Sequence, residues 1–265
     1  MFGSLHKMFQ KLNDATRRRT IRCCTFHFGR CGSTVLGNLL NAHSQIEWQS
    51  ELFHEFHERV AVVKNREEPI EHLKNLIAVS PAPVFGFECK FQHLDSNGLG
   101  LAFEQFVDQL LILGFNRFIV LNRKNYLRQA ISVARGQATR NWHLPIKQAT
   151  PPTNRIYLNL HEIGLGGQNR SLLDCFRHLE SQYATADNIL SAKHCSLLNV
   201  CYEEDLQQDP LVGYRKTVDF LSMHQEQPVI SLQQIGGKPI HSMVENFEEI
   251  QTTLRGTEFE WMLSV

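Results

Sequence analysis

The stretch that decides the fold is TIRCCTFHFGRCGSTVLGNLLN, residues 20–41. Residues 20–28 form a short and mostly apolar run that Gly29 bounds, which predicts a buried strand of a parallel sheet. Residues 33–41 predict a helix, and a glycine-containing loop joins it to the strand. This order predicts an anion site, because the N–H groups and the positive dipole end of a helix N-terminus attract anions.

The alternation of apolar runs with helical periods continues along the chain. Strands are predicted at 84–91, 117–122 and 197–202, and helices at about 101–114, 124–140, 171–190 and 210–221. Strands that alternate with helices predict an α/β fold with a central parallel sheet flanked by helices. Residues 145–170 contain a proline-rich part and the break Gly164–Gly167, and they predict an irregular insertion that is a candidate lid.

Composition narrows the class of protein. The 265 residues carry 27 Lys and Arg against 27 Asp and Glu, so a dedicated nucleic-acid binder with a strong positive field is disfavoured. Seven cysteines without a CxxC pair predict reduced, buried thiols rather than a zinc knuckle. No apolar run has membrane-spanning length and no secretory segment is recognisable, so we expect a cytoplasmic protein.

The chain divides into two parts at residue 20. Residues 1–19 predict a separate segment, with Phe2, Leu5, Phe9 and Leu12 on one side of an amphipathic helix and three arginines after it. Such a helix either docks on the protein, which is the simpler interpretation, or makes a weak contact with a membrane surface. Residues 20–265 are predicted to form a single domain, and the sequence contains no indication of the oligomeric state.

The loop after the first strand has the chemistry of an anion site. Arg30 offers a charged fork for phosphate or sulfate oxygens, and Gly32 lets the backbone approach a ligand closely. Ser33 and Thr34 add hydroxyl donors. A Walker loop would need a lysine directly before its Ser or Thr in GxxxxGK[ST], and this loop has none. Hydrolysis of nucleoside triphosphates is therefore disfavoured, whereas an ordinary turn with a helix cap stays an alternative.

A second anion subsite is predicted at the end of the strand 117–122. Arg123 follows this strand directly, at the carboxyl edge where ligands of parallel sheets bind. Ser132 lies nine residues further on, within the next helix. The two side chains can grip one phosphate only if Arg123 precedes the helix and reaches along it. A surface arginine and an unrelated helix serine are the alternative.

At this point the sequence resembles the sulfotransferases that use 3′-phosphoadenosine 5′-phosphosulfate (PAPS), especially their bacterial and carbohydrate-type members. FGRCGSTVLGNLL at 28–40 is similar to their 5′-phosphosulfate loop, and FIVLNRKNYLRQAIS at 118–132 to their 3′-phosphate motif. YEEDL at 202–206 with the following Asp209-Pro210 resembles their YEDL…DP segment, and VENFEEIQTTLRGTEFEWML at 244–263 is also typical of them. The resemblance covers residues 20 to 260 approximately.

The resemblance implies a three-layer, P-loop NTPase-like fold and transfer of a sulfuryl group from PAPS to an acceptor hydroxyl, with a carbohydrate or glycolipid as the expected acceptor. It assigns the cofactor to the 5′ loop and the 3′-phosphate motif, through Arg30, Cys31, Gly32, Ser33, Thr34, Arg123 and Ser132. Cys31 stands where a serine is common, and Glu88 where a lysine often assists the leaving group. Lys90 lies two positions on, on the same strand face, and is the candidate to replace that lysine.

Glu51 is the candidate general base, because related carbohydrate-type enzymes place a catalytic glutamate in a similar position. A carboxylate there is suited to accept a hydroxyl proton if partial burial raises its pKa. A surface glutamate paired with a basic residue is the alternative. His54 and His57 are the next candidates for the base, and His93 for contact with the acceptor or the sulfate. The chemistry needs no metal in principle, so no metal ligands are expected.

Two other classes of function stay open. A P-loop-type nucleotide kinase would share the fold, but the missing Walker lysine disfavours it. A non-catalytic protein that binds sulfated or phosphorylated ligands would share the anion loop, and only the presence of Glu51 argues against it.

Overall fold

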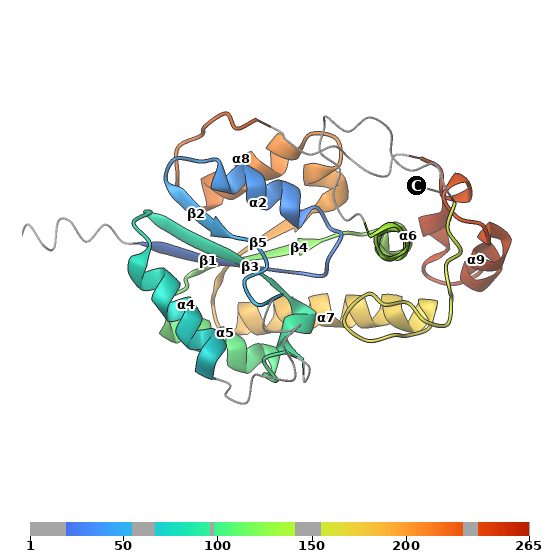
Figure 1. The fold of residues 1–265 in the computed structure, drawn as a ribbon, viewed down its shortest axis with the longest axis horizontal. Helices are drawn as coiled ribbons and strands as arrows, with labels where there is room; N and C mark the ends of the chain where they lie inside the picture. The colour runs from blue at the N-terminus through green and yellow to red at the C-terminus, as the bar shows by residue number, and fades with distance from the viewer. Residues whose placement is uncertain (1–19, 55–66, 96–97, 141–154, 230–237, 265) are drawn as a thin grey trace, which may run out of the picture.

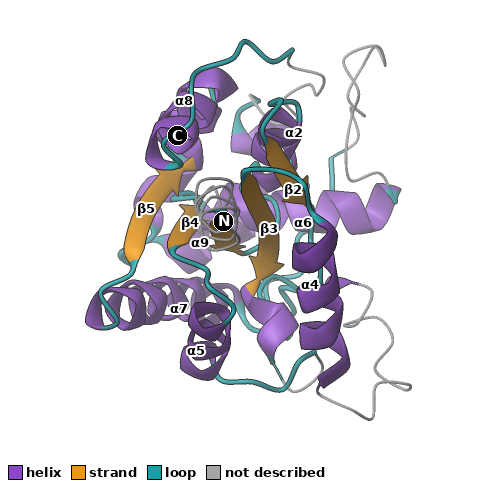
Figure 2. Ribbon diagram, turned by 90° about the vertical axis from the view of Figure 1, so that its left-hand side faces the viewer, coloured by secondary structure: helices purple, strands orange, loops and turns teal. Residues whose placement is uncertain are grey.

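The computed structural model describes residues 20–54, 67–95, 98–140, 155–229 and 238–264. Its centre is a five-stranded parallel sheet in the order β2-β3-β1-β4-β5. The strands are β1 (Ile21–His27), β2 (Ile46–Gln49), β3 (Val84–Lys90), β4 (Arg117–Asn122) and β5 (Ser196–Cys201). Figures 1 and 2 show helices on both faces of this sheet, so the expected three-layer α/β fold with a P-loop-like strand–loop–helix start is confirmed.

The helices form two layers and an end group. In Figure 1, α2 (Ser33–Asn41) and α8 (Pro210–Phe220) lie above the sheet. The lower layer contains α4 (Glu67–Val79), α5 (Phe103–Ile112) and α7 (Leu172–Ala192). Beyond the carboxyl ends of the strands lie α6 (Tyr126–Thr139) and α9 (Phe247–Leu254). Among the described residues, none of the helices combines the length and apolar character that crossing a membrane requires.

Alternation along the strands divides the core into two clusters. In β1, Cys24 and Phe26 point to the lower layer, and Cys23 points to the upper one, because successive strand side chains face opposite sides. Both faces are therefore apolar, which explains why the central strands read as continuous apolar runs rather than as alternating ones. The upper cluster also takes in Cys31 from the loop after β1.

The register of the sheet brings the candidate site together. His27, the last residue of β1, pairs with Lys90 of β3 on one side and with Leu121 of β4 on the other. The segments that follow β1, β3 and β4 therefore leave the sheet at one common edge. The anion loop follows β1 and Arg123 follows β4, so both candidate anion subsites begin at this edge.

The predicted elements agree with the structure where local pattern is strong. The helix 33–41 and the strand 117–122 have the predicted bounds, and the other predicted elements differ by a few residues at their ends. The strand β2 and the helices α4 and α9 were not predicted. Residues 55–66, which precede α4, lie outside the described residues.

The expected insertion is only partly described. Residues 155–170 are irregular, as predicted, with isolated bridges from Ile156 to Val244 and from Ile163 to Arg170. This part is packed rather than free, because it buries the apolar side chains Ile156, Leu158, Leu160, Ile163 and Leu165 in the lower cluster. Residues 145–154 of the candidate lid and the N-terminal segment 1–19 lie outside the described residues.

Candidate active site

The loop between β1 and α2 has an unusual backbone. Gly32 is the N-cap of α2 and has a φ of 87°. A Cβ atom at this position would lie 2.9 Å from Leu206 Cδ1 and 3.0 Å from Tyr202 Cδ2, so space as well as conformation requires glycine. Arg30 has a φ of 67°, a strained value for a non-glycine residue that is often found at functional sites. The loop therefore leads directly into the first turn of α2, where N–H groups have no intrahelical acceptor.

The two predicted anion subsites touch each other. Arg30 Nε donates to Ser132 Oγ at 2.9 Å, and Arg123 Nη1 donates to the carbonyl oxygen of Arg30 at 3.1 Å. Arg123 precedes α6 and Ser132 lies two turns into it, which is the arrangement that a shared phosphate requires. The contact between the subsites runs through Arg30, which the sequence had placed only in the first of them.

Gln129, and Tyr202 with Glu203, hold this arrangement in place, and these roles were not predicted from the sequence. Gln129 lies on α6, three residues before Ser132, is fully buried, and its Nε2 donates to the carbonyl oxygen of Gly29 at 2.6 Å. The guanidinium of Arg123 lies over the Tyr202 ring at 4.4 Å from the centroid, and its Nε is 3.8 Å from Glu203 Oε1. A polar residue on the inner face of a helix was the one signal in the sequence for Gln129.

The loop site carries a concentrated positive charge. Burial lowers the pKa of Arg30, and the neighbouring charge of Arg123 lowers it further. Burial also lowers the pKa of Arg123, and Tyr202 and Glu203 raise this pKa and so offset a part of the effect of burial. Arginine stays protonated in proteins, so the buried Arg123 and the partly buried Arg30 place two cations side by side at the start of α2. An anion bound here would relieve both the repulsion between them and the cost of their desolvation.

The other loop residues contribute differently from expectation. The Cys31 side chain is fully buried in the upper cluster, so only its backbone can face a ligand at the loop. Ser33 is buried and Thr34 is half-buried at the first two positions of α2. The structure thus brings together all seven residues expected for the cofactor, with backbone groups more prominent than side chains at Cys31.

The candidate catalytic residues form a cluster beside the loop. Lys90 Nζ donates to Glu51 Oε2 at 2.6 Å, and His54 Nδ1 lies 4.0 Å from the same oxygen. A Cβ at Gly29 would lie 3.5 Å from Lys90 Cε, so the lysine runs along the anion loop. Glu51 has a φ of 37°, a second non-glycine residue of the site in the left-handed region.

The expected pKa of Glu51 needs correction. Burial raises the pKa of this carboxyl, but the charge of Lys90 and the hydrogen bond from Lys90 outweigh it, with help from His27 and His54. The net pKa is lowered rather than raised, so Glu51 is ionised at neutral pH. It can still accept a proton, as a carboxylate already paired with an ammonium group.

The three histidines considered for the site, His54, His57 and His93, differ in their placement. His93 is 1% exposed, and its Nδ1 accepts the backbone N–H of Lys90 at 3.4 Å, which leaves no surface for contact with an acceptor. The expectation of such a contact is wrong, because the residue closes a 3-10 turn at Phe91–Leu94 instead. His57 lies outside the described residues, whereas the His54 side chain is half exposed.

A buried ion pair lies under the loop. Glu88 accepts from Trp48 Nε1 at 3.2 Å, and its Oε2 lies 3.5 Å from His27 Nε2. Both residues of the pair are almost fully buried. Burial lowers the pKa of His27, but the neighbouring Cys31 and Glu88 raise it to about 10. Glu88 therefore serves the core beneath α2, and the lysine that contacts the loop is Lys90.

A cavity of about 190 Å³ opens next to the loop, on the side of the lower layer. Phe28 and Phe91, which line it, directly adjoin Gly29 and Lys90 in the chain. The other lining residues are Gln92, Leu94, Asp95, Leu101, Phe103, Gly166, Gln168, Arg170, His178 and Gln182. Aromatic and leucine side chains thus form part of its wall, and amide, carboxylate, guanidinium and imidazole groups form most of the remainder.

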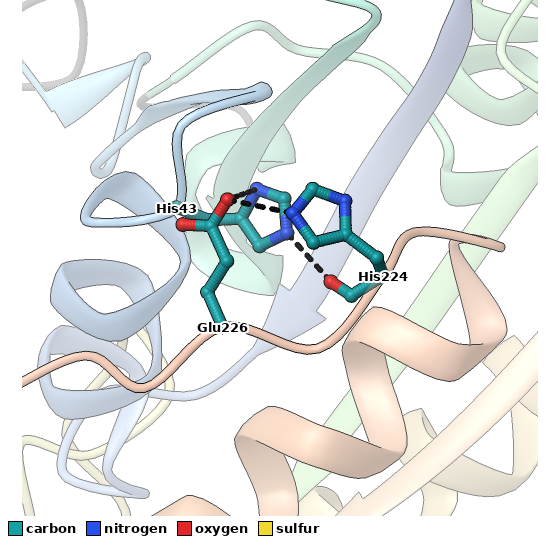
Figure 3. A group of neighbouring side chains, drawn as sticks. All are labelled: His43, His224 and Glu226. Carbon is teal, nitrogen blue, oxygen red and sulfur yellow. Dashed lines mark hydrogen bonds and ion pairs between the residues drawn. The ribbon is translucent and has the colours of Figure 1, made fainter.

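Two groups of side chains in the described residues have the composition of a metal site. Glu51, His54 and His93 form one of them, within the candidate active site. There the ammonium group of Lys90 already holds Glu51 Oε2 at 2.6 Å and would repel a cation. His43, His224 and Glu226 form the other group, which Figure 3 shows, and His43 lies at the end of α2 that is remote from the anion loop.

Comparison with known proteins found a likeness in three dimensions. The sequence matches no family model and no curated protein. The fold is similar to that of a sulfotransferase from Alicyclobacillus acidocaldarius, with a TM-score of 0.46 and 10% sequence identity. The superposition covers 92% of this chain and 93% of that chain.

Proposed function

We propose that this protein transfers the sulfuryl group of PAPS to a hydroxyl group of a carbohydrate acceptor. The observation that carries this proposal is the contact chain Arg123–Arg30–Ser132 at the start of α2, with the pair Glu51–Lys90 beside it. Two adjoining anion subsites match a ligand with phosphates at both ends of one nucleoside. The loop lacks the Walker lysine that a triphosphate would need.

The residues present fit such a donor. The N–H groups in the first turn of α2, with Arg30, would hold the 5′-phosphosulfate. Arg123 and Ser132 would hold the 3′-phosphate, with the bond between Arg30 and Ser132 opening or shifting as oxygens enter. Gln129 and Tyr202 would keep the loop and Arg123 in place. This assignment rests on the combined positive charge of the buried Arg123 and the partly buried Arg30, and on the resemblance of the loop and the 3′-phosphate motif.

The chemistry assigned to this chain is proton transfer and charge stabilisation. The acceptor hydroxyl would lose its proton to the Glu51 carboxylate while its oxygen bonds to sulfur and the bond from sulfur to the phosphate oxygen breaks. Lys90 would stabilise the negative charge that develops on the departing phosphate. Since Lys90 lies between Glu51 and the loop, one residue both lowers the pKa of the base and faces the leaving group.

The cavity beside Phe28 is proposed as the acceptor site. A volume of about 190 Å³ suits a single sugar ring rather than a long chain. Its amide, carboxylate and guanidinium groups, such as those of Gln182, Asp95 and Arg170, are the partners that several hydroxyl groups need. The partly exposed side chains of Leu101 and Phe103 would cover the apolar side of a ring.

The donor is tested by calorimetry with 3′-phosphoadenosine 5′-phosphate, the expected product, in buffer that contains EDTA. Binding without metal is expected, and Arg123→Ala should weaken it at least about a hundredfold, because it removes a charged contact worth about 3 kcal/mol. Arg177→Ala, in an exposed pair with Glu258, is the matched control and should bind as the wild type does. Absence of binding, or magnesium-dependent turnover of ATP, would contradict the proposed donor.

A further inference from the structure

Three side chains from two distant segments meet at the end of α2 that is remote from the anion loop. His43 follows α2 and precedes β2, and His224 and Glu226 follow α8, 181 or more residues later in the chain. Because α2 has nine residues, this cluster lies about 14 Å along the helix from the loop. Figure 3 shows the two imidazole rings and the carboxylate turned toward one another. The proposed transfer reaction makes no use of them.

The spacing of their nitrogen and oxygen atoms fits a zinc ion. His224 Nε2 lies 3.0 Å from Glu226 Oε1, and His43 Nδ1 lies 3.8 Å from the same oxygen. Tetrahedral Zn²⁺ with bonds of about 2.0–2.2 Å places neighbouring ligand atoms about 3.3–3.6 Å apart, and the two distances lie on either side of this range. Two histidines and one glutamate are also a ligand set that zinc prefers, with water in the fourth position.

The groups around these three side chains orient them as a metal site requires. The other ring nitrogen of His43, Nε2, is 2.9 Å from the carbonyl oxygen of His224, so its N–H donates there and Nδ1 is left as the acceptor nitrogen, 3.8 Å from Glu226 Oε1. Ser44 donates to the Glu226 carboxylate through both its N–H group and its hydroxyl group. The N–H of Gln45 reaches His43 Nδ1 at 3.1 Å, and a bound ion would displace this one hydrogen bond.

Exposure changes across the cluster in a way that leaves an access path. The side chain of His43 is fully buried, that of Glu226 is 26% exposed and that of His224 is 59% exposed. The ion would therefore enter past His224 and rest against two ligands that the protein already holds in place. In the group at Glu51, by contrast, an ammonium group competes for the carboxylate.

We propose that His43, Glu226 and His224 form a structural Zn²⁺ site with water as the fourth ligand. The ion would fasten the segment after α8 to the turn between α2 and β2, and so hold the upper layer at the edge opposite the active site. This inference is independent of the proposed transfer reaction, because none of its residues belongs to the anion loop or to the cluster at Glu51.

The test is a titration of the chelator-treated full chain with ZnCl₂ by calorimetry, followed by thermal unfolding with and without zinc. One equivalent of Zn²⁺ should bind, and a hundredfold excess over the dissociation constant should raise the Tm by about 5 °C. His224→Asn and Glu226→Gln should each weaken binding at least about tenfold and remove the rise in Tm. His224 is mostly exposed, so this variant is expected to fold.

Two controls separate this site from other histidines. His194→Asn changes an exposed histidine after α7 and should bind zinc as the wild type does. His54→Asn removes one member of the competing group at Glu51 and should also leave zinc affinity unchanged. The proposal is overturned if no equivalent of zinc binds, if His224→Asn and His194→Asn bind equally well, or if zinc binding is lost in His54→Asn instead.

Discussion

Replacing Glu51 by glutamine tests the chemistry of the site most directly. The substitution keeps the size of the side chain and an oxygen that can accept from Lys90, but it removes the negative charge that lies 2.6 Å from the ammonium group. If Glu51 is the base, turnover should fall by a factor of about 100 to 10,000, which corresponds to about 3–5 kcal/mol of transition-state stabilisation. Affinity for 3′-phosphoadenosine 5′-phosphate should change little, because Glu51 is not among its proposed contacts.

The effect on folding can be estimated from the same geometry. The side chains of Lys90 and Glu51 are 16% and 28% exposed, so the ammonium group would lose a charged partner in a largely desolvated place. We expect the free energy of unfolding to fall by about 1–2 kcal/mol. The matched control is Glu71→Gln, which opens an exposed pair with Lys74 on α4 and should change stability by under about 0.5 kcal/mol. Turnover of this control should equal that of the wild type.

The pH dependence gives a second measurement. The pKa of Glu51 lies below its ordinary value of 4.5 in the folded chain, so its contribution to stability is present above 4.5 and is lost as pH falls through the lowered pKa. The same shift predicts that kcat/KM has no acid limb from the base between pH 8 and pH 5. A histidine as the base would place an acid limb near the ordinary imidazole value of about 6.5.

The assay is transfer of labelled sulfate from PAPS to a panel of small carbohydrates, with calorimetry and urea unfolding on the same samples. Retention of wild-type turnover by Glu51→Gln would refute the assignment of the base, and an acid limb near pH 6.5 would move that role to a histidine. A large loss of cofactor affinity in Glu51→Gln, with unchanged turnover at saturation, would instead place Glu51 among the binding residues.

Three other changes test the supports of the loop. In urea unfolding, Gly32→Ala should lower the free energy of unfolding by about 1–3 kcal/mol more than Gly256→Ala does. Both glycines have positive φ, but only at Gly32 would a Cβ meet neighbouring side chains, so equal losses would contradict this expectation. Glu88→Gln should lower the free energy of unfolding by about 3 kcal/mol at pH 7, since it removes the carboxylate that, together with Cys31, raises the pKa of the buried His27. The raised pKa of His27 stabilises the wild type fully below pH 6.5, and this stabilisation is lost as pH rises toward about 10. The variant should keep only a part of this stabilisation, so parallel stability curves would argue against the pair. Gln129→Met should weaken binding of 3′-phosphoadenosine 5′-phosphate in calorimetry, because the carbonyl oxygen of Gly29 loses its donor, and unchanged affinity would remove Gln129 from the support of the loop.

Short segments whose pattern of apolar and polar residues depends only on neighbouring residues could be predicted from the sequence. The helix 33–41 and the strand 117–122 have their predicted bounds, because a buried parallel strand and a helix start depend on neighbouring residues. By contrast, β2 has only four residues and owes its place to pairing with β3, 38 positions further along in the register. No local signal of this length distinguishes a strand from a loop.

For the candidate site too, the sequence gives some of the information and the tertiary structure gives the rest. The sequence by itself singled out the anion loop and Arg123 as candidates, since residue type and position after a strand carry that information, and it offered Ser132 as a candidate on the helix that follows Arg123. Only the tertiary structure decided how these groups act on one another. Arg30 reaches Ser132 across 102 residues, and Lys90 reaches Glu51 across 39 and lowers its pKa where burial alone would raise it. The charge state of a buried group depends on which distant segment packs against it, and no pattern along one segment records that neighbour.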